Sequence, residues 1–291
     1  MSALLFYQKR FPYITLTNLL IDSSPSYSHL IARLRGADLA EDDYGVYDGT
    51  SRGAETVTMR NLIKTLVLFL MLLMLSFSHA AIADDVEDGV ASAEKGDFAA
   101  ALQLLKPLAE QGDAQAQFNL GLMYFNGNGV AQDYKTAVKW YTLAAAQGVA
   151  SAQYNLGLMF EEGNGVAQDY KTAVKWYTLA AEQGYAHAQN NLGNKLIDGQ
   201  GVAQDYNAAF KWYTLAAEQG NAFAQYNLGL MYGNAQDYVK AHMWWNIAAI
   251  DGNSDALKNY DKAAKLMTPA QIAEAQEAAS RCIKQNFKNC D

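Results

Sequence analysis

Apolar side chains recur with helical spacing through most of the chain after residue 97, in two alternating patterns. The first pattern places small and apolar residues on one helix face: Ala116, Leu120, Gly121 and Tyr124. The second has the spacing i, i+3, i+4, i+7, i+8: Ala137, Trp140, Tyr141, Ala144 and Ala145. Both periods are typical of amphipathic α-helices. The chain is therefore predicted to be all-α and built from pairs of helices.

These helix pairs repeat with a period of 36 residues. A Leu-Gly pair occurs at 120–121, 156–157, 192–193 and 228–229, and the tract 128–145 recurs unchanged as 164–181. A fixed period of this length marks a solenoid, in which each pair buries its apolar face only by stacking on its neighbours. We expect a right-handed α-solenoid of stacked antiparallel helix pairs.

The connections between the helices carry matching signals. Asp133 precedes the second helix and is predicted to be its N-cap, because its carboxylate can accept the free N–H groups of the first turn. Gly148 follows that helix, where a left-handed residue is favoured. Gly127 and Gly129 supply positive φ for the turn between the two helices.

The repeating residues resemble the Sel1-like repeat, a relative of the tetratricopeptide repeat, over about residues 97–252. The shared string is Ala…Leu-Gly…Tyr…Gly-x-Gly-Val…Asp…Ala…Trp-Tyr…Ala-Ala…Gly, which is nearly complete three times. The resemblance, to the exported bacterial type of this family, implies a scaffold that binds a protein or peptide.

The fourth unit departs from this string. It lacks four residues between Tyr232 and Asp237, and Trp244-Trp245 replaces Trp-Tyr. We expect a tighter turn there, with Trp244 in the core and Trp245 partly exposed. Trp176 lies in a central repeat and is expected to be a large core residue.

The ends of the array are expected to be caps. We place the solenoid at 84–252, with a degenerate N-terminal cap at 84–113 that begins with a helix near 85–95. Capping helices should fill 253–291, one over 255–266 and another beginning at Thr268-Pro269, with Thr as N-cap and Pro in the first turn.

The segment 59–83 has the pattern of a secretory signal peptide. A basic head after Met59 precedes an unbroken apolar run, 66–75, and small residues stand before Asp84. The run is too short to span a bilayer, which takes about 20 residues. We expect cleavage after Ala83, a periplasmic or secreted mature protein and no stable membrane span. Residues 1–58 are interpreted as a mis-assigned, disordered extension; the alternative is a cytoplasmic tail on a signal-anchored protein.

Composition argues against several kinds of partner and site. The net charge of −8 argues against a nucleic-acid partner, which requires a basic face. The four histidines are scattered, and the two cysteines stand alone near the C-terminus, so no metal site and no cofactor are expected.

Catalytic motifs are weak. Ser92-Ala93-Glu94-Lys95 is the one Ser-x-x-Lys string, and the partner motifs of β-lactamases are absent. Glu161-Glu162 is interpreted as a solvated turn, and His187 and His242 as isolated surface or packing residues. The protein is predicted not to be an enzyme. An envelope-acting hydrolase or enzyme accessory, of the β-lactamase-like type described for some secreted Sel1-repeat proteins, remains the alternative.

The two residues directly before each Leu-Gly pair form a repeated row of polar and aromatic side chains. Its members are Phe118, Asn119, Tyr154, Asn155, Asn190, Asn191, Tyr226 and Asn227. The resemblance to tetratricopeptide arrays implies that they line the concave side of the solenoid. Amides offer donors and acceptors to an extended peptide, and aromatic rings add contact area. The alternative is that these asparagines bond the neighbouring helix of the same chain.

A disulfide between Cys282 and Cys290 is expected, because both would face an oxidising compartment. Eight residues of continuous helix would separate the two Cα atoms by about 12 Å. A disulfide tolerates at most about 7 Å. The last helix must therefore end between them, where the asparagines of 285–289 let the chain turn back.

The signal peptide leads to a direct test. Mass spectrometry of the protein made in its host should find an N-terminus at Asp84. Peptides from residues 1–58 in the mature protein would contradict both the cleavage site and the reinterpreted start.

Overall fold

The computed structural model describes residues 64–68, 85–250, 252–288 and 290. The chain divides into two compact units, 1–70 and 71–291. Within the first unit the described residues 64–68 are helical. The predicted extension (1–58) and most of the signal peptide (59–83) lie outside the described residues, so their assignment stays a prediction. No described helix has the length and apolarity needed to cross a membrane.

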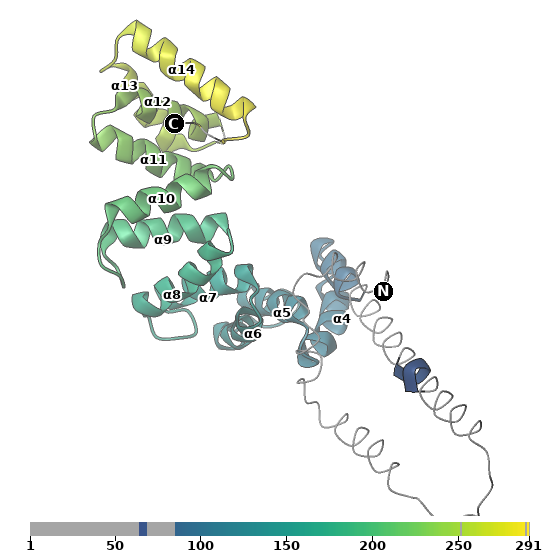
Figure 1. Ribbon diagram of the computed structural model, residues 1–291. Helices are drawn as coiled ribbons and strands as arrows, with labels where there is room; N and C mark the ends of the chain where they lie inside the picture. Colours follow the sequence, from purple (N-terminus) through teal and green to yellow (C-terminus); the bar gives the residue numbers. More distant parts are fainter. Residues whose placement is uncertain (1–63, 69–84, 251, 289, 291) are drawn as a thin grey trace, which may run out of the picture. The chain divides into compact units, whose positions relative to one another are not determined.

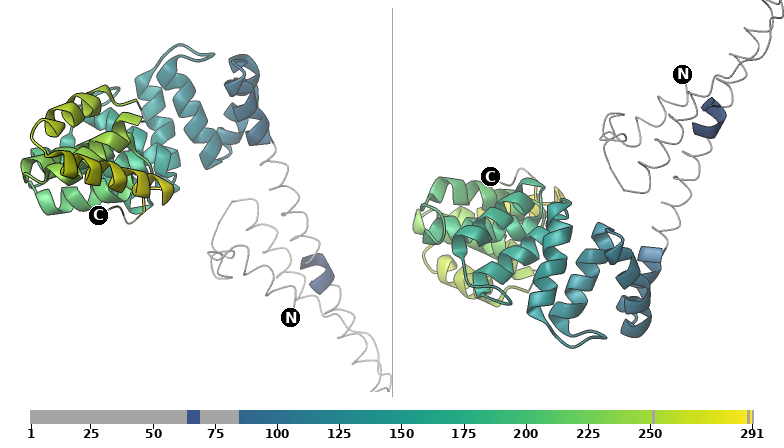
Figure 2. Two further views of the ribbon diagram at one scale, coloured as in Figure 1. Left: turned by 90° about the horizontal axis from the view of Figure 1, so that it is seen from above. Right: turned by 90° about the horizontal axis from the view of Figure 1, so that it is seen from below.

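The second unit is a succession of antiparallel helices, which confirms the all-α solenoid (Figure 1). A helix over residues 85–94 comes first, as expected. It is followed by α4 (Phe98–Glu110), α5 (Ala114–Asn126), α6 (Tyr134–Ala146), α7 (Ala150–Glu162), α8 (Tyr170–Glu182), α9 (Ala186–Asp198), α10 (Tyr206–Ala217), α11 (Ala222–Asn234), α12 (Tyr238–Ile250), α13 (Ser254–Ala264) and α14 (Pro269–Lys284). Each helix packs against the next along the chain from α4 to α13 (Figure 2).

The predicted caps and turns form. Asp133 and Asp169 each accept two N–H groups in the first turn of the second helix and a threonine hydroxyl at 2.6 Å. Gly165, with φ +72°, sits in the turn after α7, where an added Cβ would lie 2.5 Å from the backbone of Tyr134 in the preceding repeat. This glycine therefore serves both the turn and the stacking of one repeat on another.

Inside each repeat the first helix touches the second through a glycine. A Cβ added to Gly157 would lie 2.6 Å from the ring of Tyr177, and one added to Gly121 would lie 2.7 Å from the ring of Tyr141. Tyr177 and Tyr141 are almost fully buried. The glycine of each Leu-Gly pair has no side chain, and this leaves room for the tyrosine ring of the Trp-Tyr pair.

This contact corrects the expected roles of the tryptophans. Trp176 is half-buried, and its neighbour Tyr177 fills the core instead. The expectation that Trp245 is partly exposed is wrong, because it is only 7% exposed. Trp245 occupies the position of Tyr177, and its indole packs on Gly229 and donates to the carbonyl oxygen of Tyr226 at 3.3 Å.

A buried row of glutamines joins neighbouring repeats. Gln153 is 4% exposed and donates to the carbonyl oxygen of Ala145 at 3.1 Å. Gln183, at the end of α8, donates to the side-chain oxygen of Gln153 at 2.7 Å. Equivalent bonds form at Gln117 and Gln189. The row satisfies polar groups at the repeat boundaries that would otherwise be buried without partners.

The C-terminal end matches its prediction closely. The turn between α11 and α12 shortens to residues 235–237, and α14 begins with a capping box at Thr268. Cys282 and Cys290 form a disulfide with Cα atoms 4.9 Å apart. As the geometry required, α14 ends at Lys284, and Asn286 has a positive φ of 51°.

The glycine–ring contact can be tested by the sign of a stability change. In an exposed helix, replacing glycine with alanine stabilises by about 1 kcal/mol. Gly157→Ala should instead destabilise by about 1–3 kcal/mol, the range for overpacking a core, in a denaturant titration. The same change in a Tyr177→Ala background should cost less, because alanine has no ring for the added methyl group to meet. A stabilising Gly157→Ala in the wild-type background would contradict the contact.

Candidate functional site: the asparagine face of the first helices

The row predicted from the sequence lies on the first helix of each repeat, α5, α7, α9 and α11. We call it the asparagine face and define it by the eight residues Phe118, Asn119, Tyr154, Asn155, Asn190, Asn191, Tyr226 and Asn227. Asn190 is buried at 7% exposure and the other seven are half-buried. In each helix the Leu-Gly pair that follows is buried in the core of the repeat, so the row lies beside the core rather than within it.

The asparagines of this face differ in what they bond. Asn119 donates to the carbonyl oxygen of Gln115 in its own helix at 2.8 Å. Asn227 donates to the side-chain oxygens of Asn190 at 3.0 Å and Asn194 at 3.1 Å, both in the preceding repeat. At Asn227 the amide therefore has the internal partners that the alternative interpretation of this row expects.

Asn155 and Asn191 lie beside tyrosine hydroxyls. Burial raises the pKa of Tyr141, and the neighbouring Asn155 amide partly offsets this shift. Asn191 acts in the same way on the pKa values of Tyr154 and Tyr177, which burial raises. Both amides thus lie against tyrosine hydroxyls of the preceding repeat.

The centre of the asparagine face is an aromatic cluster. The ring of Tyr154 lies 5.9 Å from Tyr177, 5.3 Å from Tyr185 and 6.0 Å from His187, measured between centroids. Tyr185 and His187 are 5.8 Å apart. Tyr185 is half-buried and His187 is exposed, so the outer edge of this cluster meets solvent.

Counted from residue 114, the second and third full repeats (150–185 and 186–221) are joined by an ion pair next to this cluster. Lys195 is 6% exposed, and its ammonium lies 2.5 Å from a carboxylate oxygen of Glu161. It also donates to the side-chain oxygen of Gln200 at 2.8 Å. The hydroxyl of Tyr177 donates to the second oxygen of Glu161 at 2.5 Å. Burial raises the pKa of Tyr177, and the hydrogen bond to Glu161 raises it further.

This ion pair corrects one interpretation of the sequence. Glu162 is exposed, as expected for a solvated turn, but the side chain of Glu161 is only 24% exposed and holds two donors at once. Because both of its oxygens are engaged, the carboxylate orders the side chains around it. It links α7 to α8 and α9.

Asn190 and Asn194 extend the polar set in the third repeat. Tyr213 donates its hydroxyl to the side-chain oxygen of Asn194 at 2.7 Å, and Asn190 donates to Asn191 at 3.2 Å. Together with Asn227 they form a chain of amides from α9 to α11. Every bond in it is between neutral groups.

Asn194, Lys195 and Tyr185 were not singled out from the sequence, although a signal existed. The positions equivalent to Asn194 hold leucine in the other repeats, and those equivalent to Lys195 hold methionine: Leu122, Leu158 and Leu230, and Met123, Met159 and Met231. A polar residue at an otherwise apolar repeat position is the sign that would have found Asn194 and Lys195.

The other candidates from the sequence stay apart from this face. His242 is fully buried beside Tyr260, with ring centroids 4.0 Å apart, and burial lowers its pKa. Ser92 donates its hydroxyl to the carbonyl oxygen of Asp88 at 2.8 Å within its own helix. In the part of the chain that the structure describes, no group of three or more His, Cys, Asp or Glu side chains could hold a metal ion.

Comparison with protein-family models gives one description, Sel1 repeat. It matches five consecutive segments, 82–113, 114–149, 150–185, 186–221 and 222–253. The first segment is the predicted N-terminal cap, which is therefore a repeat in its own right. No curated protein sequence matches the chain.

Solved structures match the helical array. The chain is similar to c5321, a protective antigen of uropathogenic Escherichia coli strains displaying an SLR fold, at 34% identity and a TM-score of 0.61. That match covers 71% of this chain, which spans only 50% of c5321. A Sel1 repeat protein from Oxalobacter formigenes matches at 31% identity and a TM-score of 0.60, over 68% of this chain and 82% of its own.

Proposed function

Because this chain belongs to the Sel1 repeat family, which generally mediates protein–protein interaction, we propose that it is an exported scaffold that binds a protein or peptide through its asparagine face. The observation that carries the proposal is the aromatic cluster of Tyr154, Tyr185 and His187. One side of the cluster packs against the protein, and the other side meets solvent. Because packing already restricts the rings, they would lose little conformational entropy when a partner binds.

Amide groups flank this cluster on both sides. Asn155 lies next to Tyr154 on α7, and Asn191 lies on α9 beside the hydroxyls of Tyr154 and Tyr177. Each amide carries two donors and an oxygen acceptor, more than its tyrosine contacts use. The remaining capacity supports hydrogen bonding to the backbone of an extended segment.

The buried ion pair supports a role in fixing the surface. Glu161 and Lys195 replace apolar residues of other repeats, and such a replacement gains little stability by itself. Its effect is to hold Tyr177, and through it the cluster, in one arrangement. A binding site on rigid elements loses less free energy when the partner docks.

Export is supported by the disulfide. A bonded cysteine pair fits an oxidising compartment such as the periplasm or the exterior. Sel1 repeat scaffolds are generally non-catalytic, and the Ser92 hydroxyl is engaged within its helix. These points favour a scaffold over the envelope hydrolase that the sequence left open.

The proposal is tested with Tyr154→Ala/Asn155→Ala. The immobilised wild-type protein is used to capture partners from an envelope extract, which are quantified by mass spectrometry. The double variant should lose at least tenfold of the captured partner, because it removes the central ring and an adjacent amide. The melting temperature should fall by only a few degrees, since both side chains are half-buried.

A matched control is Lys106→Ala/Glu110→Ala on α4, where both side chains are exposed. It should capture the partner as the wild type does. Unchanged capture by the Tyr154/Asn155 variant would refute binding at the asparagine face. Unfolding of that variant would show that the row is structural.

A further inference from the structure

A second surface runs along the second helices of the middle repeats. α6, α8 and α10 each expose a leucine at the same repeat position, Leu143, Leu179 and Leu215, with 48%, 44% and 44% exposure. One and two helical turns earlier stand exposed lysines: Lys135, Lys139, Lys171, Lys175 and Lys211. We call these eight residues the lysine–leucine face. It is separate from the asparagine face, which lies on the first helices.

The fourth repeat shows this surface in a covered form. The positions of Lys171, Lys175 and Leu179 are taken in α12 by Val239, Met243 and Ile247. Met243 and Ile247 are 2% and 1% exposed. At these repeat positions α12 thus has apolar residues where α8 has lysines, and Met243 and Ile247 are buried where Lys175 and Leu179 are exposed.

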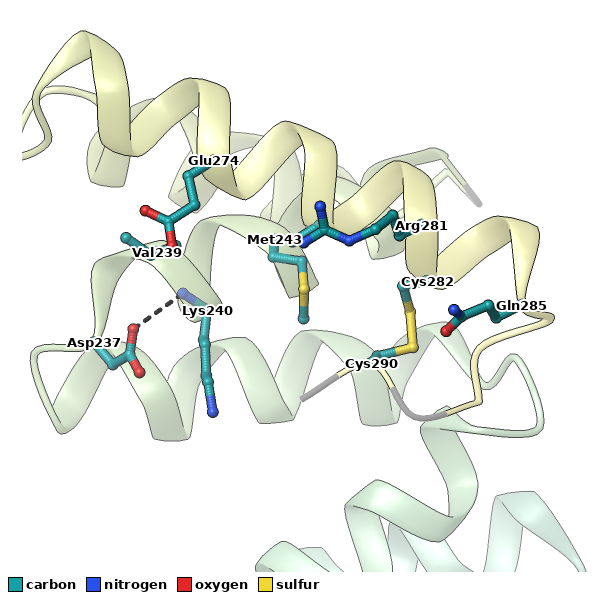
Figure 3. A pocket seen from close by; sticks show the side chains of 10 residues that line it. Asp237, Val239, Lys240, Met243, Glu274, Arg281, Cys282, Gln285 and Cys290 are labelled. Carbon is teal, nitrogen blue, oxygen red and sulfur yellow. Dashed lines mark hydrogen bonds between the residues drawn. A yellow bond between two sulfur atoms is a disulfide. The ribbon is translucent and has the colours of Figure 1, made fainter.

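The element that covers α12 is an amphipathic helix. α14 packs along α12, with Ala279 and Cys282 buried in the same cluster as Met243 and Ile247 (Figure 1). Glu274 and Arg281 lie on α14 across a pocket of about 440 Å³ from Val239 and Met243 (Figure 3). The disulfide fixes the end of α14 in this position. The chain thus contains its own example of a helix docked on this face.

We propose that the lysine–leucine face of α6, α8 and α10 is a docking surface for an acidic amphipathic helix of a protein partner. The leucines continue the row that α14 covers in α12, so a helix placed on them would extend an interface that already exists. Its apolar side would meet Leu143, Leu179 and Leu215, as α14 meets Ile247.

The lysines determine the charge of that partner. None of the five forms an ion pair with another residue that the structure describes. Asp133 and Asp169, whose pKa values are lowered by helix hydrogen bonds and to a smaller extent by Lys139 and Lys175, are engaged by the N–H groups and threonine hydroxyls of their helices. Five cations without bonded counter-charges on a protein of net charge −8 favour a partner whose helix carries Asp or Glu beside its apolar side.

The test uses the full chain, expressed and purified from its host, with a photo-crosslinking amino acid at residue 179. The crosslinked partner segment, identified by mass spectrometry, should be helical, apolar on one side and rich in Asp or Glu. A synthetic peptide of that segment should bind the protein with a Kd that weakens at least tenfold in Leu143→Gln/Leu179→Gln/Leu215→Gln. It should also weaken when 50 mM salt is raised to 300 mM.

Two controls separate this surface from others. Tyr154→Ala/Asn155→Ala should leave the peptide Kd unchanged, so failure of one surface does not imply failure of the other. Vesicles of anionic lipid should not compete with the peptide. Three results would overturn the proposal: crosslinks to lipid or to no protein, a dimer that the triple leucine variant dissociates, or equal peptide affinity for the triple variant and the wild type. Since the leucines are about half exposed, circular dichroism should show that the triple variant stays folded.

Discussion

The structure depends on the close approach of a glycine in the first helix of each repeat to a ring in the second. No side chain can be added at Gly121 or Gly157 without meeting the ring of Tyr141 or Tyr177. The same approach occurs at both ends of the array with other partners: Leu105 against Gly89 in the N-terminal segment 82–113 and Trp245 against Gly229 in the segment 222–253. The contact therefore requires the glycine strictly and a flat or branched apolar partner more loosely.

Because this contact and the buried glutamine row hold the array together, the remaining positions are free to differ between repeats. The third repeat uses that freedom most. Asn190, Asn194 and Lys195 replace an aromatic residue, a leucine and a methionine, yet α9 has the same length and position in the sequence of helices as α7. Lys195 and Asn190 bond across the repeat boundaries, to Glu161 and Asn227. Asn194 accepts from Tyr213 inside its own repeat and from Asn227 in the next one. The repeated residues form the fold, and the polar residues peculiar to this repeat extend the proposed site.

The fold was predictable from the sequence because a period of 36 residues is a long-range signal in a single chain. The end of α14 was predictable too, since the spacing of Cys282 and Cys290 excludes a continuous helix. The roles of Trp176 and Trp245 were not, because adjacent residues on a helix both fit the same apolar pattern and only the facing glycine decides which is buried. Glu161 was misread for a related reason, since its partners Tyr177 and Lys195 come from other helices.

The central claim is that four polar residues, Glu161 on α7 and Asn190, Asn194 and Lys195 on α9, serve binding rather than stability. It is tested by returning them to the residues of the other repeats, with Glu161→Phe, Asn190→Tyr, Asn194→Leu and Lys195→Met in one variant. Replacing a buried ion pair with apolar residues is often neutral or stabilising by about 1–4 kcal/mol. The account predicts a melting temperature equal to or above that of the wild type and loss of the partner captured by the wild type. Full binding by this variant would contradict it.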